Sequence, residues 1–391
     1  MSAVRGRGPE VVAWPSWPQW DGRELDVLRQ VLASGNWGGY AEALGEFERA
    51  FGERHAARHC IGAMNGTVSL VAAFAACEIG AGDEVIVPAY TFFATASAVR
   101  LAGATPVFVD IDPDTYNLDV GAAEAAIGER TKAIVPMHFA GLPVDLDLLL
   151  PLAEKHGLVV IEDAAHAHGS SWRGRPVGAL GRVGSFSFQA NKNMTAGEGG
   201  ALLTNDAALA ERLWSYVNQG RSSEGSWYEH PHLGSNLRLT GWQAAVLQIQ
   251  LDRLDGQLER RMKSSRYLHE ELAQFGGLRP LVWDERADNH AHHLFVLRYG
   301  PEEFGGLSRA EFCLELEARG IPSSAGYGMP LYRQQSLTPP LSRVTPCPAA
   351  EAACGEAIWL SQNLLLAEEA QLAAIPEAVD EILNDRRRLV P

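Results

Sequence analysis

Residues 55 to 205 alternate between short apolar runs rich in β-branched residues and longer stretches whose apolar residues recur with helical spacing. The short runs are EVIVPAY (84–90), PVFVDID (106–112), KAIVPMHF (132–139), LVVIEDAA (158–165), GSFSFQ (184–189) and GALLTN (200–205). Segments such as TVSLVAAFAACEIG and LDLLLPLAEKHG separate them. Strands that are apolar almost throughout are buried on both faces, and helices between parallel strands supply that cover. The alternation therefore predicts an α/β fold with a mostly parallel sheet between layers of helices.

The pattern changes after residue 240. Residues 240–275 have helical periodicity throughout, and a helix of that length commonly links domains or packs against a partner. A strand in HHLFVLRYG (292–300), a helix in LSRAEFCLELEARG (307–320) and a last helix in EEAQLAAIPEAVDEIL (368–383) follow. We therefore expect a large domain over residues 1–250, with an N-terminal arm, and a smaller C-terminal α+β domain over residues 251–391.

Charge and composition exclude several classes of partner. A formal net charge of −15 opposes binding to nucleic acid or to an anionic membrane, because phosphate contacts need a positive surface. The first residues lack the apolar core of a signal peptide, and no window approaches about 18 uninterrupted apolar residues. Five widely spaced cysteines without a CxxC pair suggest reduced thiols. We expect a cytoplasmic protein that acts on small molecules, with no nucleic acid and no membrane as partner.

Polar and aromatic residues stand where the predicted strands end. Because the carboxyl ends of parallel strands meet at one edge of the sheet, these residues are expected on one rim. They are Asn65, Gly66 and Thr67 after CIGAM, then Thr91, Phe92 and Phe93, then His138, then Asp163 and His166, and finally Ser187, Gln189 and Lys192.

This set of side chains suits pyridoxal 5′-phosphate. A helix that begins at Gly66 and Thr67 presents unpaired N–H groups to a phosphate. A buried Asp163 can keep a pyridine nitrogen protonated, and a flat aromatic residue can stack on the ring. A desolvated lysine with a lowered pKa can form a Schiff base with the aldehyde.

Lysine is rare in this chain. Only four of the 33 basic side chains are lysines, namely Lys132, Lys155, Lys192 and Lys263. Where arginine serves every ordinary need for positive charge, a lysine in an apolar strand-turn indicates a role that arginine cannot fill. Imine formation is such a role, because a guanidinium stays protonated and is a poor nucleophile. The alternative is that Lys192 is a solvated surface charge, as a lone lysine in a loop commonly is.

Six segments resemble, in order, the signature segments of the DegT/DnrJ/EryC1/StrS aminotransferases. They are NGTVSLVAAF, GDEVIVPAYTFFATASAV, VPMHFAGLPVDLD, VIEDAAHAHGS, SFSFQANKNMTAGEGGALLTND and GSNLRLTGWQAAVLQIQL. The similarity covers nearly the whole chain. It implies a fold-type I pyridoxal-phosphate enzyme that acts on sugar or cyclitol ketones.

The resemblance also implies roles around the cofactor ring. Lys192 would be the Schiff-base lysine, and Asp163 would pair with the pyridine nitrogen. His166 would lie beside the ring near its phenolic oxygen, which makes these three the catalytic residues. Phe92 would stack on the ring, with Phe93 as its competitor and ordinary core packing as the alternative for both.

Phosphate binding follows from the resemblance in the same way. The main chain of Gly66, the hydroxyl of Thr67 and Ser187 would hold the phosphate. Asn236, in GSNLR, matches a position that the neighbouring subunit supplies in this family. The implied active unit is a homodimer whose active site is shared between subunits.

Two features bear on the branch of the family. Many members have histidine where this chain has Gln189. The aromatic N-terminal stretch WPSWPQWDGRELDVLRQVLASGNWGGY and the FSFQ spelling are closer to cyclitol (inosose) aminotransferases and 3-amino-5-hydroxybenzoate synthases. Because Lys192 is present, a sugar 3-dehydratase, which has histidine there, is disfavoured.

The expected function is transfer of an amino group from L-glutamine or L-glutamate to a keto-cyclitol or keto-sugar in antibiotic biosynthesis. One alternative is an aromatising synthase that makes 3-amino-5-hydroxybenzoate. A second is a pyridoxal-phosphate-binding subunit without catalysis that serves a partner. Candidate substrate contacts are Glu198, Tyr228, His230 and Tyr327.

Several of these residues also have structural explanations. Asp163 could cap the helical stretch that follows it. His166 could be a core histidine, and for His138 a core role is as plausible as a functional one. The cluster His290, His292 and His293 resembles a metal site but lacks a carboxylate at ligand spacing, which favours packing or solvent contact.

Overall fold

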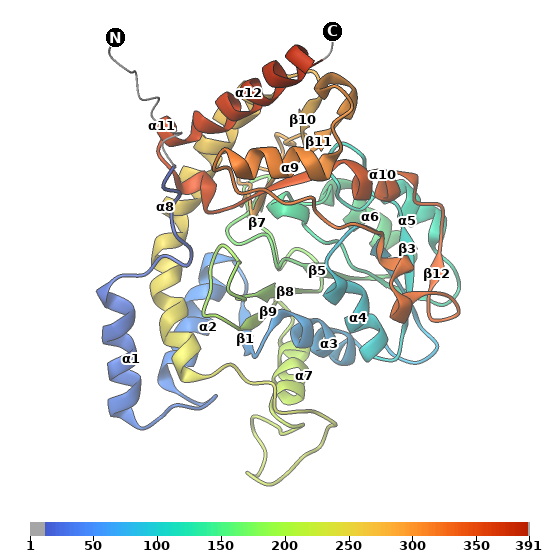
Figure 1. Ribbon diagram of the computed structural model, residues 1–391. Coiled ribbons are helices and arrows are strands. Elements are labelled where there is room, and N and C mark those ends of the chain that lie inside the picture. Colours follow the sequence, from blue (N-terminus) through green and yellow to red (C-terminus); the bar gives the residue numbers. More distant parts are fainter. Residues whose placement is uncertain (1–11, 390–391) are drawn as a thin grey trace.

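A central eight-stranded sheet organises the computed structural model, which describes residues 12–389 (Figure 1). Its strand order is β1-β9-β8-β5-β4-β2-β3-β12, and all neighbours are parallel except at β9, which is antiparallel to both β1 and β8. The strands are β1 (His59–Ala63), β2 (Glu84–Pro88), β3 (Thr105–Val109), β4 (Thr131–Ile134), β5 (Val159–Asp163), β8 (Val183–Ser187), β9 (Gly200–Thr204) and β12 (Arg343–Val344). The predicted mostly parallel α/β sheet is confirmed.

Helices cover both faces of this sheet, as the continuous apolar strands require. In β2, Val85 and Val87 pack into one hydrophobic cluster and Ile86 into another on the opposite face. The first cluster includes α3 (Gly66–Ala76), α4 (Phe93–Leu101) and α7 (Ala207–Val217), whereas the second includes α2 (Glu42–Arg54), α5 (Val120–Ala126) and α6 (Leu146–His156).

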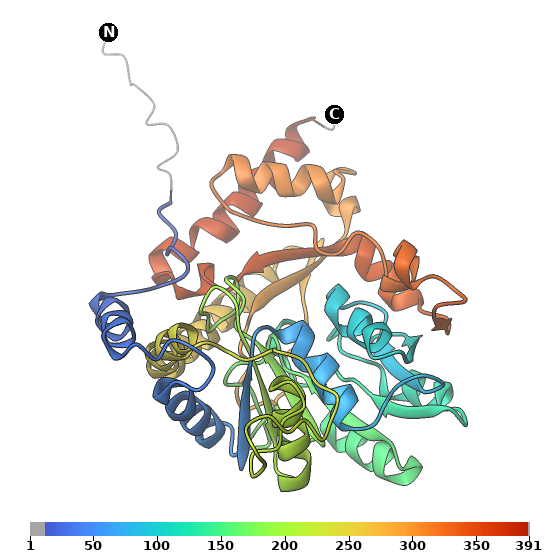
Figure 2. The same cartoon turned by 90° about the horizontal axis from the view of Figure 1, so that it is seen from below.

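A smaller antiparallel sheet lies on one side of the central sheet in both views (Figures 1 and 2). It has the order β10 (Leu278–Pro280), β11 (Leu294–Tyr299), β13 (Ala357–Ser361), and its own core includes residues of α9 (Arg309–Ala318) and α12 (Ala374–Leu389). The predicted strand and two helices are present, the last helix being divided into α11 (Glu369–Leu372) and α12. Strands β10 and β13 were not predicted.

One helix, α8 (Gly241–Leu272), runs between the two regions. Thr240 and Gln243 form a capping box at its start, which fixes where the helix begins. Its first turns pack into the core with α2, and Leu268 and Leu272 near its end pack into the core of the small sheet. The expected boundary between residues 250 and 251 falls inside this helix, and β12 of the C-terminal region pairs with β3 of the large sheet. The domain division stays a prediction.

The remaining elements are short or peripheral. They are α1 (Gly22–Ser34), α10 (Pro348–Glu356), β6 (Ser171–Trp172), β7 (Arg175–Pro176) and the 3-10 turns Phe139–Gly141, Pro301–Phe304, Leu331–Arg333, Gln335–Leu337 and Leu364–Leu366. All five cysteines are free thiols. Within residues 12–389, no helix combines the length and the apolar character needed to cross a bilayer.

Candidate active site

The start of α3 and the end of β8 touch each other. A Cβ placed on Gly66 would lie 2.7 Å from the Cβ of Ser187, so only glycine allows this approach. The side chain of Asn65 caps the helix by accepting the N–H of Val68 at 3.0 Å. The structure therefore brings together Gly66, Thr67 and Ser187, the three residues expected around a phosphate, at a helix N-terminus whose first N–H groups are available for an anion.

Asp163 ends β5 in a buried position, with 4% of its surface exposed. Its Oδ2 accepts a hydrogen bond from Thr95 Oγ1 at 2.7 Å, and Thr95 is 3.2 Å from the hydroxyl of Thr91. Desolvation raises the pKa of Asp163, although the bond from Thr95 and the positive charge of Lys192 oppose that rise. A cationic ring nitrogen would stabilise the ionised form further.

Sequence reasoning missed Thr95. Thr91 and Thr95 are four residues apart and α4 begins at Phe93, so their hydroxyls can meet on one side of the chain. That spacing, directly after a strand end, was the available signal. Thr95 orients Asp163, so the carboxylate is held by the helix as well as by its strand.

Lys192 lies in the turn after β8. Its main-chain N–H donates to the carbonyl of Gln189 at 2.9 Å, and the Gln189 side chain accepts the N–H of Asn191 at 2.9 Å. In this chain Gln189 thus shapes the turn that carries the lysine. Desolvation lowers the pKa of the Lys192 amine to about 8, and the charge of Asp163 partly offsets this effect. A fraction of the amine is therefore neutral and nucleophilic near neutral pH.

His166 is buried in the loop after β5, and its Nδ1 has no hydrogen-bond partner among residues 12–389. Burial, followed by the positive charge of Lys192, lowers the pKa of His166 well below its usual range. The imidazole is therefore neutral. The charge of Lys192 affects the pKa values of both Asp163 and His166, so Lys192 lies close to each of them.

Three aromatic residues are candidates for contact with the cofactor or the substrate. Phe92, at the start of α4, is 55% exposed and Phe93 is 40% exposed, so neither is core packing in the single chain. Tyr327 contacts Tyr90 and Trp359 edge-to-face, at ring distances of 5.2 and 4.6 Å. Burial, with a further contribution from the charge of Asp163, raises the pKa of Tyr327, which places this residue of the C-terminal region near the site.

His138 belongs to the opposite face of the sheet. Its Nε2 donates to the carboxylate of Glu162 at 3.1 Å, and its Nδ1 accepts the N–H of Val144 at 3.1 Å. Glu162 also accepts N–H groups from Gly178, Leu180 and Gly181. Burial opposes ionisation of Glu162, but the His138 bond and these N–H groups hold the pKa of its carboxyl below the usual value. The pair is structural, which resolves the choice that the sequence left open for His138.

Four other expected residues are not buried with this group in the single chain. Glu198, Tyr228, His230 and Asn236 are exposed. Tyr228 and His230 belong to a loop that extends beyond α7, away from the central sheet (Figure 1). Asn236 pairs with Asn218 at the base of that loop. The residue after Asn236 lies beside the candidate phosphate site, because the carbonyl of Leu237 accepts the N–H of Met64 at 2.7 Å. The roles of these four residues stay predictions.

The residues present fit pyridoxal phosphate on three observations. Gly66, where an added Cβ would collide with Ser187, lets the end of β8 come close to a helix start, so that the Ser187 hydroxyl lies beside N–H groups that can bind an anion. A buried carboxylate, Asp163, ends the neighbouring strand β5 and is available to a cationic nitrogen. His166 Nδ1 is a buried polar atom without a partner in the described part of the chain. A donor set of this kind matches the phosphate, the ring nitrogen and the ring oxygen of one molecule.

Comparison with known proteins gives a matching family. Residues 18–379 match the model of the DegT/DnrJ/EryC1/StrS aminotransferase family. The match extends over the large sheet, α8 and most of the small sheet region, so it includes all the candidate site residues.

Individual relatives match over nearly their whole length. The chain is 37% identical to 3-amino-5-hydroxybenzoate synthase of Amycolatopsis mediterranei, over 94% of this chain and 96% of the relative. It is 36% identical to L-glutamine:2-deoxy-scyllo-inosose aminotransferase of Micromonospora echinospora, over 100% and 99%. A crystal structure of 3-amino-5-hydroxybenzoic acid synthase superposes with a TM-score of 0.91 at 35% identity, covering 96% of this chain and 100% of that one.

Proposed function

The chain belongs to the DegT/DnrJ/EryC1/StrS aminotransferase family, and from this premise we propose that it transfers an amino group from L-glutamine to an inosose-type keto-cyclitol. The protein is a pyridoxal-phosphate-dependent aminotransferase. The observation that carries the proposed substrates is the full-length similarity to an enzyme named for L-glutamine and 2-deoxy-scyllo-inosose. Such a reaction belongs to the biosynthesis of aminocyclitol antibiotics.

Each side chain has a defined task in this reaction. When bound, pyridoxal phosphate supplies an electron-withdrawing ring that stabilises negative charge on the amino-bearing carbon of a substrate. The α3 N-terminus and Ser187 hold the phosphate, and Asp163 keeps the ring nitrogen protonated. Lys192 Nζ, with its pKa lowered to about 8, takes a proton from the α-carbon of the donor and delivers one to the carbon that receives the amine.

The same proposal includes a homodimer with a shared active site. Exposed apolar side chains support it, among them Phe92 and Met64 beside the site and Trp227, Tyr228 and Leu233 on the projecting loop. Leu233 is 92% exposed, and a cluster of such residues is typical of an interaction surface. Asn236 at the base of this loop would reach the phosphate of the neighbouring subunit. Tyr228 and His230 would then lie near the partner's substrate. The cytoplasm stays the expected location.

The test uses the purified protein loaded with pyridoxal phosphate. L-Glutamine alone should change the absorbance of the bound cofactor, and adding scyllo-inosose or 2-deoxy-scyllo-inosose should restore the first spectrum and form an amine. Lys192→Ala should abolish both changes. Lys263→Ala is the matched control, because Lys263 is an exposed lysine on α8 that pairs with Glu369 at 3.5 Å.

Two results would contradict the proposal. A protein that shows no cofactor absorbance at all is not this enzyme. A protein that binds the cofactor but never responds to glutamine or glutamate fits instead a non-catalytic subunit that serves a partner.

A second candidate function is the aromatising synthesis of 3-amino-5-hydroxybenzoate. The observation that favours it is the TM-score of 0.91 to a synthase of that name, together with the full-length similarity to the Amycolatopsis mediterranei relative. An aminodehydroshikimate-type substrate distinguishes the two. The synthase would convert it to a product with aromatic absorbance without an amino donor, whereas the inosose aminotransferase would leave it unchanged.

A further inference from the structure

A second buried histidine lies against His166. The ring centres of His166 and His293 are 4.1 Å apart, with planes inclined by 41°. His293 is 7% exposed and comes from the segment just before β11, far from His166 in sequence. No in-plane hydrogen bond holds His166 Nδ1 within residues 12–389. The plane of the His166 ring is therefore fixed by packing, and His293 is the ring closest to it.

Asn193 fixes His293 in one tautomer. The Asn193 Nδ2 group donates to the carbonyl of Ala291 at 2.6 Å, which identifies Oδ1 as the acceptor that faces His293 Nδ1 at 3.0 Å. His293 Nδ1 must then carry the proton and Nε2 must not. Asn193 follows Lys192 directly in sequence and is 1% exposed. The residue that holds His293 is therefore the immediate neighbour of the catalytic lysine.

The backbone around His293 is equally constrained. The His293 N–H donates to the carbonyl of Ala140 at 2.7 Å. A Cβ on Gly141 would lie 2.9 Å from Ala291, from the carbonyl of His166 and from the N–H of His292, so three segments meet there without space. His292 itself has a φ of 44°, a positive value that few residues other than glycine adopt. The segment is held in a conformation that directs residues 290 and 292 to one side and 293 to the other.

Burial and the nearby charge of Lys192 keep both His166 and His293 neutral. Burial, and after it the positive charge of Lys192, lowers the pKa of His293 well below the usual value, as for His166. Two neutral rings can pack against each other without repulsion, and neither adds a positive charge that would compete with the lysine.

We propose that Asn193 and His293 are positioning residues that hold the His166 imidazole in a fixed plane against the cofactor ring. Asn193 holds His293 by a hydrogen bond, and the tilted ring of His293 packs against His166. The inference rests on the proposed function, because it assigns His166 to the cofactor.

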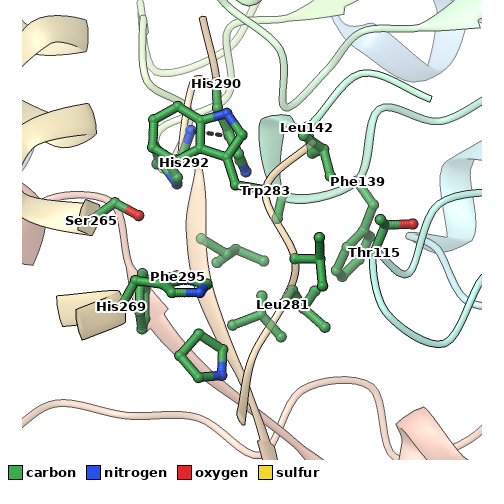
Figure 3. Close-up of a pocket in the computed structure, with 15 residues that line it drawn as sticks. Thr115, Phe139, Leu142, Ser265, His269, Leu281, Trp283, His290, His292 and Phe295 are labelled. Carbon is green, nitrogen blue, oxygen red and sulfur yellow. Dashed lines mark hydrogen bonds between the residues drawn. The ribbon is translucent and has the colours of Figure 1, made fainter. Parts of the chain in front are cut away.

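His290 supplies a matched control. It is another buried histidine of the same segment, but it stacks on His292 at 3.6 Å and faces Trp283 in a small cavity on the other side of the strand (Figure 3). Its Nδ1 accepts the N–H of His292 at 2.9 Å, so removing it takes away a buried imidazole and one backbone hydrogen bond but no side chain in contact with His166.

The experiment compares His293→Ala, His293→Phe, Asn193→Ala and His290→Ala in the cofactor-loaded enzyme. The readouts are the pH midpoint of the cofactor absorbance change, kcat, KM and the unfolding temperature. His293→Ala should move the midpoint by about one pH unit and lower kcat on the order of 10- to 100-fold, because a misplaced group near the reacting atoms costs that much. His293→Phe keeps a flat ring, so its pH midpoint and kcat should be closer to those of wild type. The values for Asn193→Ala should lie between those of wild type and His293→Ala. His290→Ala should change neither the midpoint nor kcat.

The contrary result is equally defined. If His293→Ala and His293→Phe lower only the unfolding temperature, as His290→Ala does, and leave the midpoint and kcat unchanged, His293 is a packing residue and the inference is wrong. Failure of the proposed function looks different, because the wild-type protein itself would then show no cofactor absorbance or no response to glutamine.

Discussion

Adjacent carboxylates in β5 have opposite surroundings. Glu162 points to one face of the sheet, where His138 and three N–H groups favour its ionised form, whereas Asp163 points to the other face, where desolvation raises its pKa. Successive residues of a strand alternate between faces, so one step along the chain separates a structural ion pair from a candidate catalytic group. The single residue is the scale at which this site acquires its chemistry.

Gly66 offers a direct test at the same scale. Gly66→Ala would place a Cβ 2.7 Å from that of Ser187, so the end of β8 or the start of α3 must shift. We expect at least about a tenfold weaker affinity for pyridoxal phosphate, measured by absorbance titration, and a loss of about 1–3 kcal/mol in the free energy of unfolding. Gly45→Ala, at an exposed position of α2 with no atom within 4 Å, should leave affinity unchanged and stabilise the fold by about 0.5–1 kcal/mol. Unchanged cofactor affinity in Gly66→Ala would show that this contact is not part of the phosphate site.

Individual elements bring these residues together through their ends. The start of α3, the start of α4 and the ends of β5 and β8 meet at one rim, and Thr95 of α4 bonds to Asp163 of β5 across it.

A contact with a helix holds one edge of the sheet in place. Strand β1 lies at that edge, and the N–H of its Gly62 is accepted at 2.7 Å by Glu48 of α2. Helix and edge strand are thereby joined by a buried carboxyl.

Glu48 makes the stability of this pair of elements depend on pH. Desolvation raises its pKa to about 7, from 4.5 in an exposed glutamate. The folded protein therefore holds this proton more tightly than the unfolded chain. The stability that the proton contributes is complete below about pH 4.5 and is lost as the pH rises through 7.

Glu48→Gln keeps an oxygen for the Gly62 N–H without the charge. Between pH 5.5 and pH 8, wild type should lose about 1–2 kcal/mol of unfolding free energy that the variant retains, measured by urea denaturation at both values. Glu42→Gln, at an exposed position of the same helix, should behave as wild type. Equal pH dependence in all three proteins would rule out ionisation of Glu48 in this range.

At the scale of the whole molecule, α8 ties the two regions and the projecting loop reaches outward. The small sheet brings Tyr327 and His293 to a site otherwise built by the large sheet. The loop that precedes Asn236 extends away from the central sheet (Figure 1). In the proposed shared active site, Asn236 and this loop would reach the neighbouring subunit. Subunit mixing tests this arrangement.

Mixing two inactive variants should restore activity. In a dimer of one Lys192→Ala chain and one Asn236→Ala chain, one site combines an intact Lys192 with an intact Asn236 from the other subunit. Random reassociation should then recover up to about a quarter of wild-type turnover, since half of the dimers are mixed and each has one complete site. Each variant alone should remain impaired. Absence of recovery in a mixture shown to contain mixed dimers would place Asn236 in the site of its own chain or in neither.

Local pattern determined much of this protein. Continuous apolar strands separated by helical stretches predicted the parallel sheet, because burial on both faces leaves that signature in the sequence. Strand ends predicted the meeting of Gly66, Asp163, Ser187 and Lys192, since parallel strands place their carboxyl ends at one edge. Family-like segments in their order predicted the class of enzyme, and the family match confirms it.

Other features depended on contacts between distant segments, which no local period encodes. β12 joins β3 across more than two hundred residues, and α8 passes through the expected domain boundary without interruption. His138 pairs with Glu162 because both side chains lie on the same face of the sheet. Thr95, Asn193 and His293 acquire their importance from the side chains they touch. Local pattern thus predicted most strands of the large sheet and where they end, whereas tertiary packing decided which buried polar groups become partners, because burial makes each of them require one.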